Sequence, residues 1–434
     1  MGGKIKRFFS LIVNQDYIFS VVSKFAGVFI ALVYSIIFTR YIGAELKGET
    51  AIISNYISLI SSILCLGMYQ AYPYFKKRGE DVFYPFLNNM TSFYILAGAG
   101  FALAAVFLPI AMNIKVALFL IPLQSYIRHI NYVVTIEKPK TRNIASMVIN
   151  VTDIFVVLGF MVFATPSYNL AVAILVIQTL VNFTISFANL KMALRKFRFT
   201  LKLIPRYAKF GFMPMITLFL MTVNYRIDVI MLEKAATVAT TQIGIYSVGV
   251  ALAEKVWLIP DAVKDILRSR LCKDKGKDEV AKVIRLNLFV AVMTVLFTAL
   301  VSKPFVDIVY GADYAGADII TVILLVGIVG MIFYKMVYSY NITMGKQLIN
   351  LVFLAVAAAA NVVGNLIFIP MWGIYGAALT SVISYTLCGI CFLIYFKHST
   401  GVPFRMMLFI QKEDIALIKS FIAKMKQKKK EKGE

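Results

Sequence analysis

The 434-residue chain has very few of the side chains that build metal and redox sites, with 4 cysteines and 2 histidines. Cys65, Cys388 and Cys391 lie in apolar runs, where cysteine usually behaves as a small packing residue. Cys388 and Cys391 have CxxC spacing, but inside an apolar helix this spacing favours packing over ligation or redox chemistry. We therefore expect neither a metal site nor a bound cofactor.

The chain also lacks the residue sets that carry the commonest enzyme chemistries. It contains no recognisable Ser/His/Asp set and no glycine-rich loop of the kind that cradles a nucleotide phosphate. We expect no catalytic residue and no site for ATP hydrolysis. The energy for any active process should then come from a proton or sodium gradient, or from consumption of the substrate outside.

Charge is scarce as well. Only 15% of the residues are charged and 60% are hydrophobic, whereas soluble domains have about 25% and 45–50%. About 20 mostly apolar residues are needed for a helix to cross a bilayer. Twelve runs meet or approach this length: 21–39, 51–75, 86–112, 116–136, 144–164, 170–190, 210–232, 243–263, 286–302, 319–342, 349–369 and 374–396. The runs are long and continuous, so the sequence predicts an all-α, polytopic membrane protein with about twelve transmembrane helices.

The basic residues indicate the orientation of these helices. With the N-terminus inside, 35 of the 45 lysines and arginines fall in cytoplasmic segments, five fall outside and five fall within the spans. Because cytoplasmic loops carry an excess of basic residues, both termini are predicted to be cytoplasmic. The formal charge of +23 is then explained by contacts with anionic membrane lipids, without nucleic acid as a partner.

A weak internal repeat predicts two halves. A shift of 207 residues superimposes spans four to six on spans ten to twelve and aligns Arg128 with Lys335 and Asn143 with Asn350. We expect an N-terminal six-helix half over 1–200 and a C-terminal six-helix half over 201–400, around a central cavity.

The remaining segment, 401–434, is predicted to be a basic cytoplasmic tail. Its apolar residues recur at helical spacing beside lysines, which suits an amphipathic helix at the membrane surface, and a disordered basic tail is the alternative. The stripe consists of Ile415, Ile418, Phe421, Ile422 and Met425.

Charged residues inside the spans mark candidate sites, because a charge at the bilayer centre needs a cavity or a partner. The basic ones are Lys24, Arg128, Arg226, Lys255 and Lys335, and the acidic ones are Asp153, Asp228 and Glu254. The alternatives are that Lys24 and Arg226 reach the membrane surface and that Lys255 pairs with an acidic neighbour. Asp228 is a candidate ion-coupling site or a partner in a salt bridge between helices.

Arg128 and Lys335 are the strongest candidates for a cavity, because both lie near the middle of their spans at equivalent positions in the two halves. Arg128 also shares a helix face with Gln124, Asn131 and Thr135, and this polar face should line an interior. The excess of basic residues favours an anionic substrate.

Several short motifs, in their order along residues 18–397, resemble one family. The segment from Asn365 to Ala378 contains Pro370, Gly373 and Gly376, which would end one helix and allow close packing of the next. This segment, together with Gly244-Ile-Tyr246, Val309–Tyr314 and the turn Arg40–Gly43, is similar to segments of polysaccharide repeat-unit flippases, of O-antigen and capsular type. They belong to the multidrug/oligosaccharidyl-lipid/polysaccharide exporter superfamily.

The resemblance implies a flippase of the bacterial cytoplasmic (inner) membrane. Its substrate would be an undecaprenyl-pyrophosphate-linked oligosaccharide that moves by alternating access from the inner to the outer leaflet, for cell-surface polysaccharide synthesis. Its expected partners are the glycosyltransferases and polymerase of the same pathway. The basic residues within the spans would bind the pyrophosphate.

Two other functions compete with this interpretation. A drug/cation antiporter of the same superfamily should favour an acidic cavity, whereas here five basic residues face three acidic ones within the spans. A membrane polysaccharide polymerase or ligase would need a substantial exposed catalytic loop, and the predicted outside loops are short.

Overall fold

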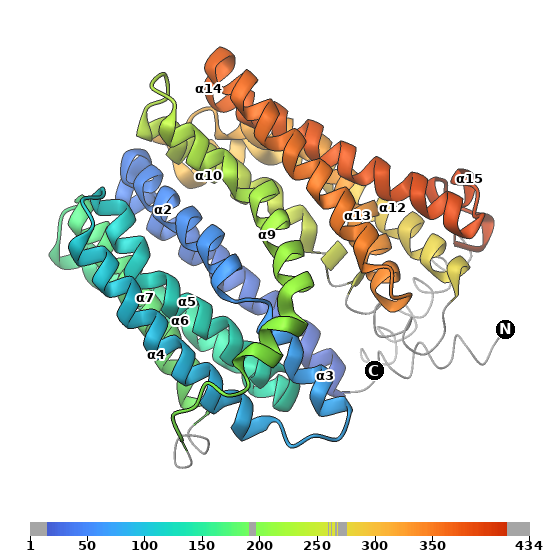
Figure 1. The fold of residues 1–434 in the computed structure, drawn as a ribbon. Helices are drawn as coiled ribbons and strands as arrows, with labels where there is room; N and C mark the ends of the chain where they lie inside the picture. The colour runs from blue at the N-terminus through green and yellow to red at the C-terminus, as the bar shows by residue number, and fades with distance from the viewer. Residues whose placement is uncertain are drawn as a thin grey trace, which may run out of the picture. The chain divides into compact units, whose positions relative to one another are not determined.

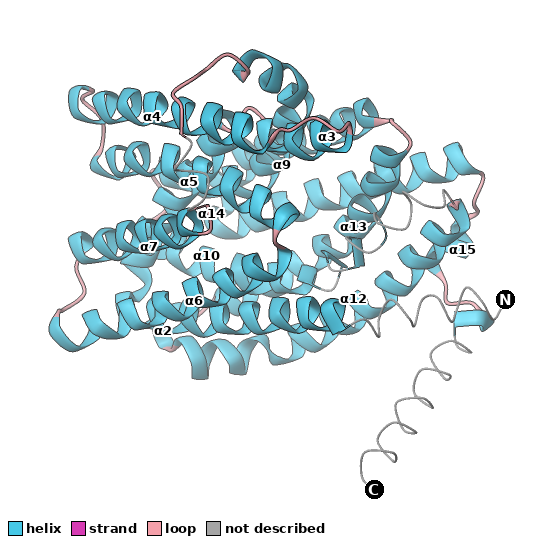
Figure 2. Cartoon of the chain, turned by 90° about the horizontal axis from the view of Figure 1, so that it is seen from below, coloured by secondary structure: helices cyan, strands magenta, loops and turns pink. Residues whose placement is uncertain are grey.

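The computed structural model describes residues 15–190, 197–258, 260–261, 263–264, 267 and 276–414. Figure 2 shows that these residues form helices joined by loops, with no strand among them. The helices within the first of two compact units are α2 (Gln15–Leu64), α3 (Ala71–Lys77), α4 (Phe83–Phe107), α5 (Met112–Glu137), α6 (Pro139–Phe163), α7 (Tyr168–Ala188) and α9 (Ile204–Lys234). Those of the second unit include α12 (Lys277–Phe305), α13 (Ala317–Thr343), α14 (Gln347–Thr400) and α15 (Phe404–Leu408).

The two units meet in sequence within α10 (Thr240–Glu254). The first comprises Met1–Ser247 and Val306–Ala315, and the second comprises Val248–Phe305 and Gly316–Glu434. This packing boundary lies further along the chain than the boundary near residue 200 that the repeat predicts. The division into two six-helix halves stays a prediction.

α2 and α14 each consist of two helical arms joined by a tight turn. In α14, Gly373 has φ 54° and ψ −129°, and the chain reverses there. The Ser384 hydroxyl accordingly donates to the Ala357 carbonyl of the other arm at 2.8 Å. In α2 the corresponding turn is at Gly43, with φ 78°. Such positive φ values favour glycine, which explains why glycine occupies the turn position in both motif segments.

Eight helices of the described residues are long and apolar enough to cross a membrane, and α2 and α14, with 50 and 54 residues, each have two arms. The more polar α5 and the 15-residue α10 are the helices that would complete the predicted twelve crossings, and the number twelve stays a prediction. Figure 1 shows α4, α5, α6 and α7 running side by side in the first unit, and α13 against α14 in the second. The prediction of an all-α, polytopic protein is confirmed.

The second predicted span, 51–75, is interrupted. The second arm of α2 ends at Leu64, and α3 begins only at Ala71. Leu66 and Gly67 have φ values of 46° and 59°, which stops the helix. α9 crosses this break at Gly211. The two backbones are so close that a Cβ on Gly67 would lie 2.1 Å from the carbonyl oxygen of Gly211. A broken helix at membrane depth is tolerated where it borders protein or a cavity.

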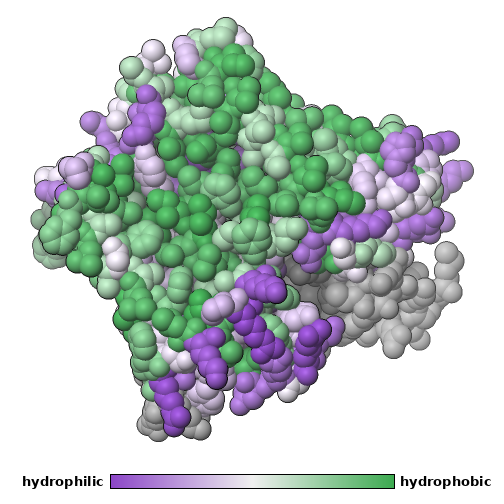
Figure 3. Space-filling view, in the orientation of Figure 1, coloured by the Kyte–Doolittle hydropathy of each residue, from purple (hydrophilic) through white to green (hydrophobic). Residues whose placement is uncertain are grey.

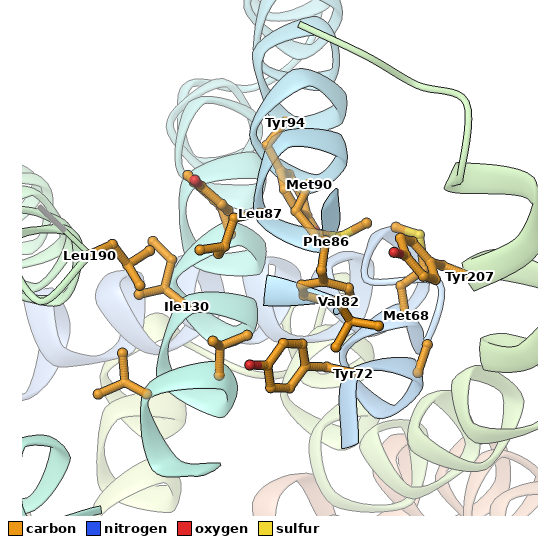
Figure 4. Close-up of a cluster of buried hydrophobic side chains, with 14 of the residues drawn as sticks. Met68, Tyr72, Val82, Phe86, Leu87, Met90, Tyr94, Ile130, Leu190 and Tyr207 are labelled. Atoms are coloured by element: carbon orange, nitrogen blue, oxygen red, sulfur yellow. The ribbon is translucent and has the colours of Figure 1, made fainter. Parts of the chain in front are cut away.

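An aromatic cluster fills one end of the first unit. Figure 4 shows Tyr72, Phe86 and Tyr207 converging from α3, α4 and α9, with Ile130 of α5 beside them. The rings of Phe86 and Tyr207 lie 5.2 Å apart. In Figure 3, hydrophilic residues gather at the end of this unit where α3 lies, and hydrophobic residues cover its flank. This distribution is that of a surface facing lipid between two polar edges.

The C-terminal segment docks on α12. Arg285 donates from Nη2 to Asp414 Oδ1 at 2.9 Å and from Nη1 to the Met406 carbonyl at 2.5 Å. Burial raises the pKa of Asp414, but the bonds from Arg285 and from the Gln411 backbone outweigh it and leave the pKa below its usual range. The predicted amphipathic stripe, Ile415–Met425, lies outside the described residues.

The predicted orientation can be tested with single cysteines in a variant that lacks the four native ones. Cysteines at 236 and 312, both exposed positions, should react in intact cells with a thiol reagent that cannot cross the membrane. A cysteine at 276 should react only after the membrane is opened. Labelling at 276 in intact cells would overturn the assignment of both termini to the cytoplasm.

Candidate functional site

A polar cavity lies inside the first unit, within the membrane-spanning helices. Its volume is about 830 Å³, and both arms of α2 together with α5, α6 and α7 form its walls. The cavity is large enough for part of a sizeable polar ligand, since small-molecule sites occupy roughly 300–1,000 Å³. The predicted stripe of Gln124, Arg128, Asn131 and Thr135 lies on its wall, so this face of α5 does line an interior.

The charges on the wall are mostly positive. Among the residues that the structure describes, three basic ones line the cavity: Lys47 from α2, Arg128 from α5 and Arg142 from α6. Asp153 of α6 is the one carboxylate in this described lining. Three cations against one carboxylate in a region of low dielectric attract an anion and disfavour a cation.

The directions of the helices place the three cations at different depths. Asn150 of α6 donates to the Gly27 carbonyl at 2.9 Å, and the Tyr41 hydroxyl donates to the Ala164 carbonyl at 2.7 Å. The first arm of α2 therefore runs parallel to α6. The turn at Gly43 then lies at the end of the unit opposite to the start of α6.

Arg142 lies in the first turn of α6, and Arg128 lies nine residues before the adjoining end of α5 at Glu137. Lys47 follows the turn at Gly43, and its Nζ lies 5.6 Å from the centre of the Phe38 ring. With a rise of 1.5 Å per residue, Arg142 and Lys47 are separated along the helices by roughly 25 Å, with Arg128 at an intermediate depth. The cavity thus has a cation near each end and one between them.

Neutral polar groups fill the wall between the cations. They are hydroxyls and amides in the main, among them Ser54, Ser58, Gln124, Asn131, Gln178, Thr179 and Asn182. Gln124 donates to the Thr179 hydroxyl at 3.1 Å, and the Tyr34 hydroxyl donates to Gln178 at 2.9 Å. Such a surface combines donors and acceptors, which is the chemistry that recognises hydroxyl groups.

Some polar atoms of the wall have no hydrogen-bond partner within the part of the chain that the structure describes. They are Asn55 Oδ1, Arg142 Nη1, Asp153 Oδ1 and Gln178 Nε2, and all four atoms are buried. Buried polar atoms without partners cost free energy, so a site that keeps them is expected to supply partners from a ligand or from water. Arg128, by contrast, places Nη1 3.8 Å from the Cys65 sulfur at the break of α2.

Lys335 has different surroundings from Arg128. It lies in the second unit, is 6% exposed, and places Nζ 2.8 Å from Asp261 Oδ1 and 4.5 Å from the centre of the Trp257 ring. Asp261 also pairs with Lys264 at 2.9 Å. The sequence named no partner for Lys335, because its partner is 74 residues away and outside the aligned repeat.

The other predicted residues lie at several places. Asp228 of α9 is buried, accepts from the backbone N–H of Val229 at 2.9 Å and receives a hydrogen bond from the Tyr246 hydroxyl. Arg226 of the same helix is half-buried and does not line the cavity. Lys24 lies in α2, but its side chain falls outside the described residues.

Glu254 and Lys255 are half-buried neighbours at the end of α10, in the second unit. Of the seven predicted site residues whose side chains the structure describes, Arg128 and Asp153 line the polar cavity of the first unit and the other five do not. Their roles in binding and ion coupling stay predictions.

Two cavity residues were missed by sequence reasoning. Lys47 is one of the five basic residues predicted to lie outside and Arg142 is one of the 35 predicted to be cytoplasmic, because the apolar runs near them begin at 51 and 144. The helices extend beyond these runs, since α2 continues through its turn and α6 begins at Pro139. The proline after a charged segment is a common helix start and was the available signal.

No group of three or more histidines, cysteines, aspartates or glutamates able to hold a metal ion occurs within the described ranges. The CxxC cysteines are both free thiols, with Cys388 buried and Cys391 half-buried in α14.

Residues 111–319, a little under half of the chain, match the profile of a family described as "Polysaccharide biosynthesis protein". No curated protein sequence matches the chain closely enough to count as a relative.

Several solved structures have a similar fold. The "Lipid II flippase MurJ, inward closed conformation" has a TM-score of 0.70 at 16% identity, covering 90% of this chain and 89% of that chain. An inward-facing multidrug resistance transporter of the MATE family, of the MOP superfamily, has a TM-score of 0.64 at 12% identity, with 85% and 94% covered. An outward-facing structure from the same group of transporters has a TM-score of 0.58 at 13% identity, with 88% and 94% covered. The protein thus shares its fold with these transporters, and the profile match over residues 111–319 confirms its resemblance to a polysaccharide biosynthesis family.

Proposed function

We propose that this protein is a flippase that moves an undecaprenyl-pyrophosphate-linked oligosaccharide repeat unit from the inner to the outer leaflet of the bacterial cytoplasmic membrane. The observation that carries the proposal is the polar cavity with three cations and one carboxylate. The family profile of polysaccharide biosynthesis and the fold shared with transporters support it.

In this proposal the pyrophosphate is held by the basic residues of the cavity. Arginine can form two parallel hydrogen bonds to phosphate oxygens, so Arg142 and Arg128 provide the grip and Lys47 provides a point charge. Arg142 lies near the expected cytoplasmic end, where it would meet the substrate first. The substrate would then pass to Arg128 and finally toward Lys47.

The oligosaccharide would lie against the neutral polar wall. Amide and hydroxyl groups such as those of Gln124, Asn131 and Asn182 can both donate to and accept from sugar hydroxyls. Because these contacts are to hydroxyl groups that all sugars carry, they suit a repeat unit of several sugars.

The experiment that tests this function is reconstitution of the purified protein in liposomes that contain a lipid-linked oligosaccharide. The competing drug/cation antiporter predicts transport of a lipophilic cation instead. A polymerase or ligase predicts that the oligosaccharide itself is lengthened or transferred, which mass spectrometry of the recovered lipid detects.

Asp153 is the carboxylate best placed to couple transport to a proton or sodium gradient. It lines the cavity, and its Oδ1 has no hydrogen-bond partner among the described residues, whereas Asp228 is held by Tyr246 and the Val229 backbone. We expect Asp153→Asn to abolish the dependence of transport on the ion gradient while leaving the amount of folded protein unchanged. Asp228→Asn, the matched control, should keep that dependence, and the opposite pattern would make Asp228 the coupling residue.

A further inference from the structure

A second cavity of the first unit differs completely in chemistry from the polar one. Its volume is about 820 Å³, and it is an open groove along α4, between α5 and the start of α9. All twelve of its lining residues are apolar: Leu64, Phe93, Leu96, Ala97, Gly100, Phe101, Ala104, Leu108, Leu118, Leu201, Ile204 and Pro205. The described lining offers no hydrogen bond from a side chain, so the ligand chemistry that fits the groove over this length is hydrocarbon.

Small residues of α4 form the groove. Ala97, Gly100 and Ala104 lie one turn apart on one face of the helix, with Phe93 and Phe101 beside them. A Cβ on Gly100 would meet nothing within 4 Å, so the space above it is open. From Phe93 to Leu108 the groove runs along the helix for about 22 Å, which is most of the hydrocarbon thickness of a bilayer.

One end of the groove is closed by the segment that leads into α9. This segment is tied to α4, because the Thr200 backbone N–H donates to the Ser92 hydroxyl at 3.0 Å and the Leu203 N–H donates to Asn89 at 2.9 Å. Figure 1 shows this segment crossing beside α4 before α9 begins.

The same segment carries positive charge. Lys202 follows Leu201, which lines the groove, and Arg198 lies three residues before Leu201. Both basic side chains are exposed, and neither has an ion pair to any residue that the structure describes. Arg206, in contrast, is paired with Glu80 at 2.8 Å. The groove therefore combines an apolar channel with two exposed cations at one end.

We propose that this groove is a binding site for an anionic phospholipid of the surrounding membrane. One acyl chain lies along α4 over Ala97, Gly100 and Ala104, and the phosphate meets Lys202 and Arg198. A hydrocarbon chain alone would explain the apolar walls, but the charge at the closed end selects an anionic headgroup over a zwitterionic one. The site is separate from the polar cavity, so the proposal does not depend on the substrate of the transporter.

The test uses two phospholipids that carry the same photoreactive acyl chain, one with a phosphatidylglycerol and one with a phosphatidylcholine headgroup. The purified full-length protein is irradiated in nanodiscs that contain each lipid, and the labelled peptides are identified by mass spectrometry. We expect labelling of residues 93–108 at least threefold stronger with phosphatidylglycerol.

Gly100→Phe should fill the groove and reduce this labelling at least threefold. Gly98→Phe is the matched control, since Gly98 lies two residues away on α4, does not line the groove and also has open space at its Cβ. The double variant Lys202→Gln, Arg198→Gln should keep labelling of α4 but abolish the preference for phosphatidylglycerol.

Equal labelling by the two headgroups in the unaltered protein would overturn the proposal, as would equal effects of Gly100→Phe and Gly98→Phe. A polyprenyl phosphate is added in a competition arm. If it displaces phosphatidylglycerol from residues 93–108 at a tenfold lower concentration, the groove belongs to a polyprenyl chain and the phospholipid assignment is wrong.

Discussion

Replacing Arg128 with alanine should reduce transport of the lipid-linked oligosaccharide about tenfold or more at matched levels of folded protein. Arg128 lies at intermediate depth in the cavity, between the cations near its ends. A hydrogen bond to a charged group contributes about 1.5–3 kcal/mol, and about 1.4 kcal/mol corresponds to a factor of ten. Arg128→Lys should recover part of the activity, because a point charge replaces a two-pronged contact. Transport is measured as the rate of appearance of the oligosaccharide in the outer leaflet.

The comparison is Arg206→Ala, which removes an arginine that is half-exposed and paired with Glu80 outside the cavity. Its ion pair is exposed, so this variant should transport at nearly the normal rate. Lys335→Ala gives a second comparison. The repeat predicts that Lys335 binds the same anion as Arg128. In that case the double variant Arg128→Ala, Lys335→Ala should transport only a little more slowly than the slower of the two single variants. If Lys335 serves only its ion pair with Asp261, the two effects should multiply. Near-normal transport in Arg128→Ala would contradict the proposed role of the cavity.

Gly211→Ala should prevent most of the protein from folding. A Cβ at this position would lie 2.2 Å from the Leu66 carbonyl oxygen and 2.6 Å from a backbone carbon of Gly67. Both atoms belong to the backbone of the break after α2, so no side-chain rotation can relieve the overlap. Overpacking of a well-packed interior costs about 1–3 kcal/mol, and we expect the upper end of that range or more. The measurement is the yield of monodisperse protein in detergent and its melting temperature.

Gly100→Ala is the matched control for Gly211→Ala. Both are glycines within long helices of the first unit, but a Cβ on Gly100 meets nothing within 4 Å. Alanine favours helix over glycine by about 1 kcal/mol, so Gly100→Ala should be neutral or slightly stabilising. Normal yield and melting temperature for Gly211→Ala would show that the backbone of α9 lies further from the break after α2 than these distances indicate.

Much of the fold could be predicted because it depends on local patterns. Apolar runs of sufficient length predict membrane helices whatever the tertiary structure, and the turn at Gly373 was predicted from Pro370 and the glycines around it. The break at Leu66 and Gly67 could not be predicted in this way. It depends on the approach of Gly211, which lies more than 140 residues further along the chain.

The candidate site was predicted only in part, for a related reason. Arg128 could be found because a charge in an apolar run stands out, and its neighbours share a helical face. Lys47 and Arg142 border the apolar runs, so composition alone could not separate them from loop residues. Lys335 and its partner Asp261 come from different helices, and such pairs become visible only when the packing is known.

The central claim is that the protein moves an anionic, lipid-linked oligosaccharide between leaflets. It is tested most directly in liposomes that contain the purified protein and a fluorescent undecaprenyl-pyrophosphate-linked oligosaccharide, with an impermeant reagent that modifies only the sugar exposed outside. The account predicts that the protein renders the inner-leaflet pool accessible, that Arg128→Ala slows this at least about tenfold, and that a lipophilic cation is not transported. Transport of the lipophilic cation, with no movement of the oligosaccharide in the same liposomes, would contradict it.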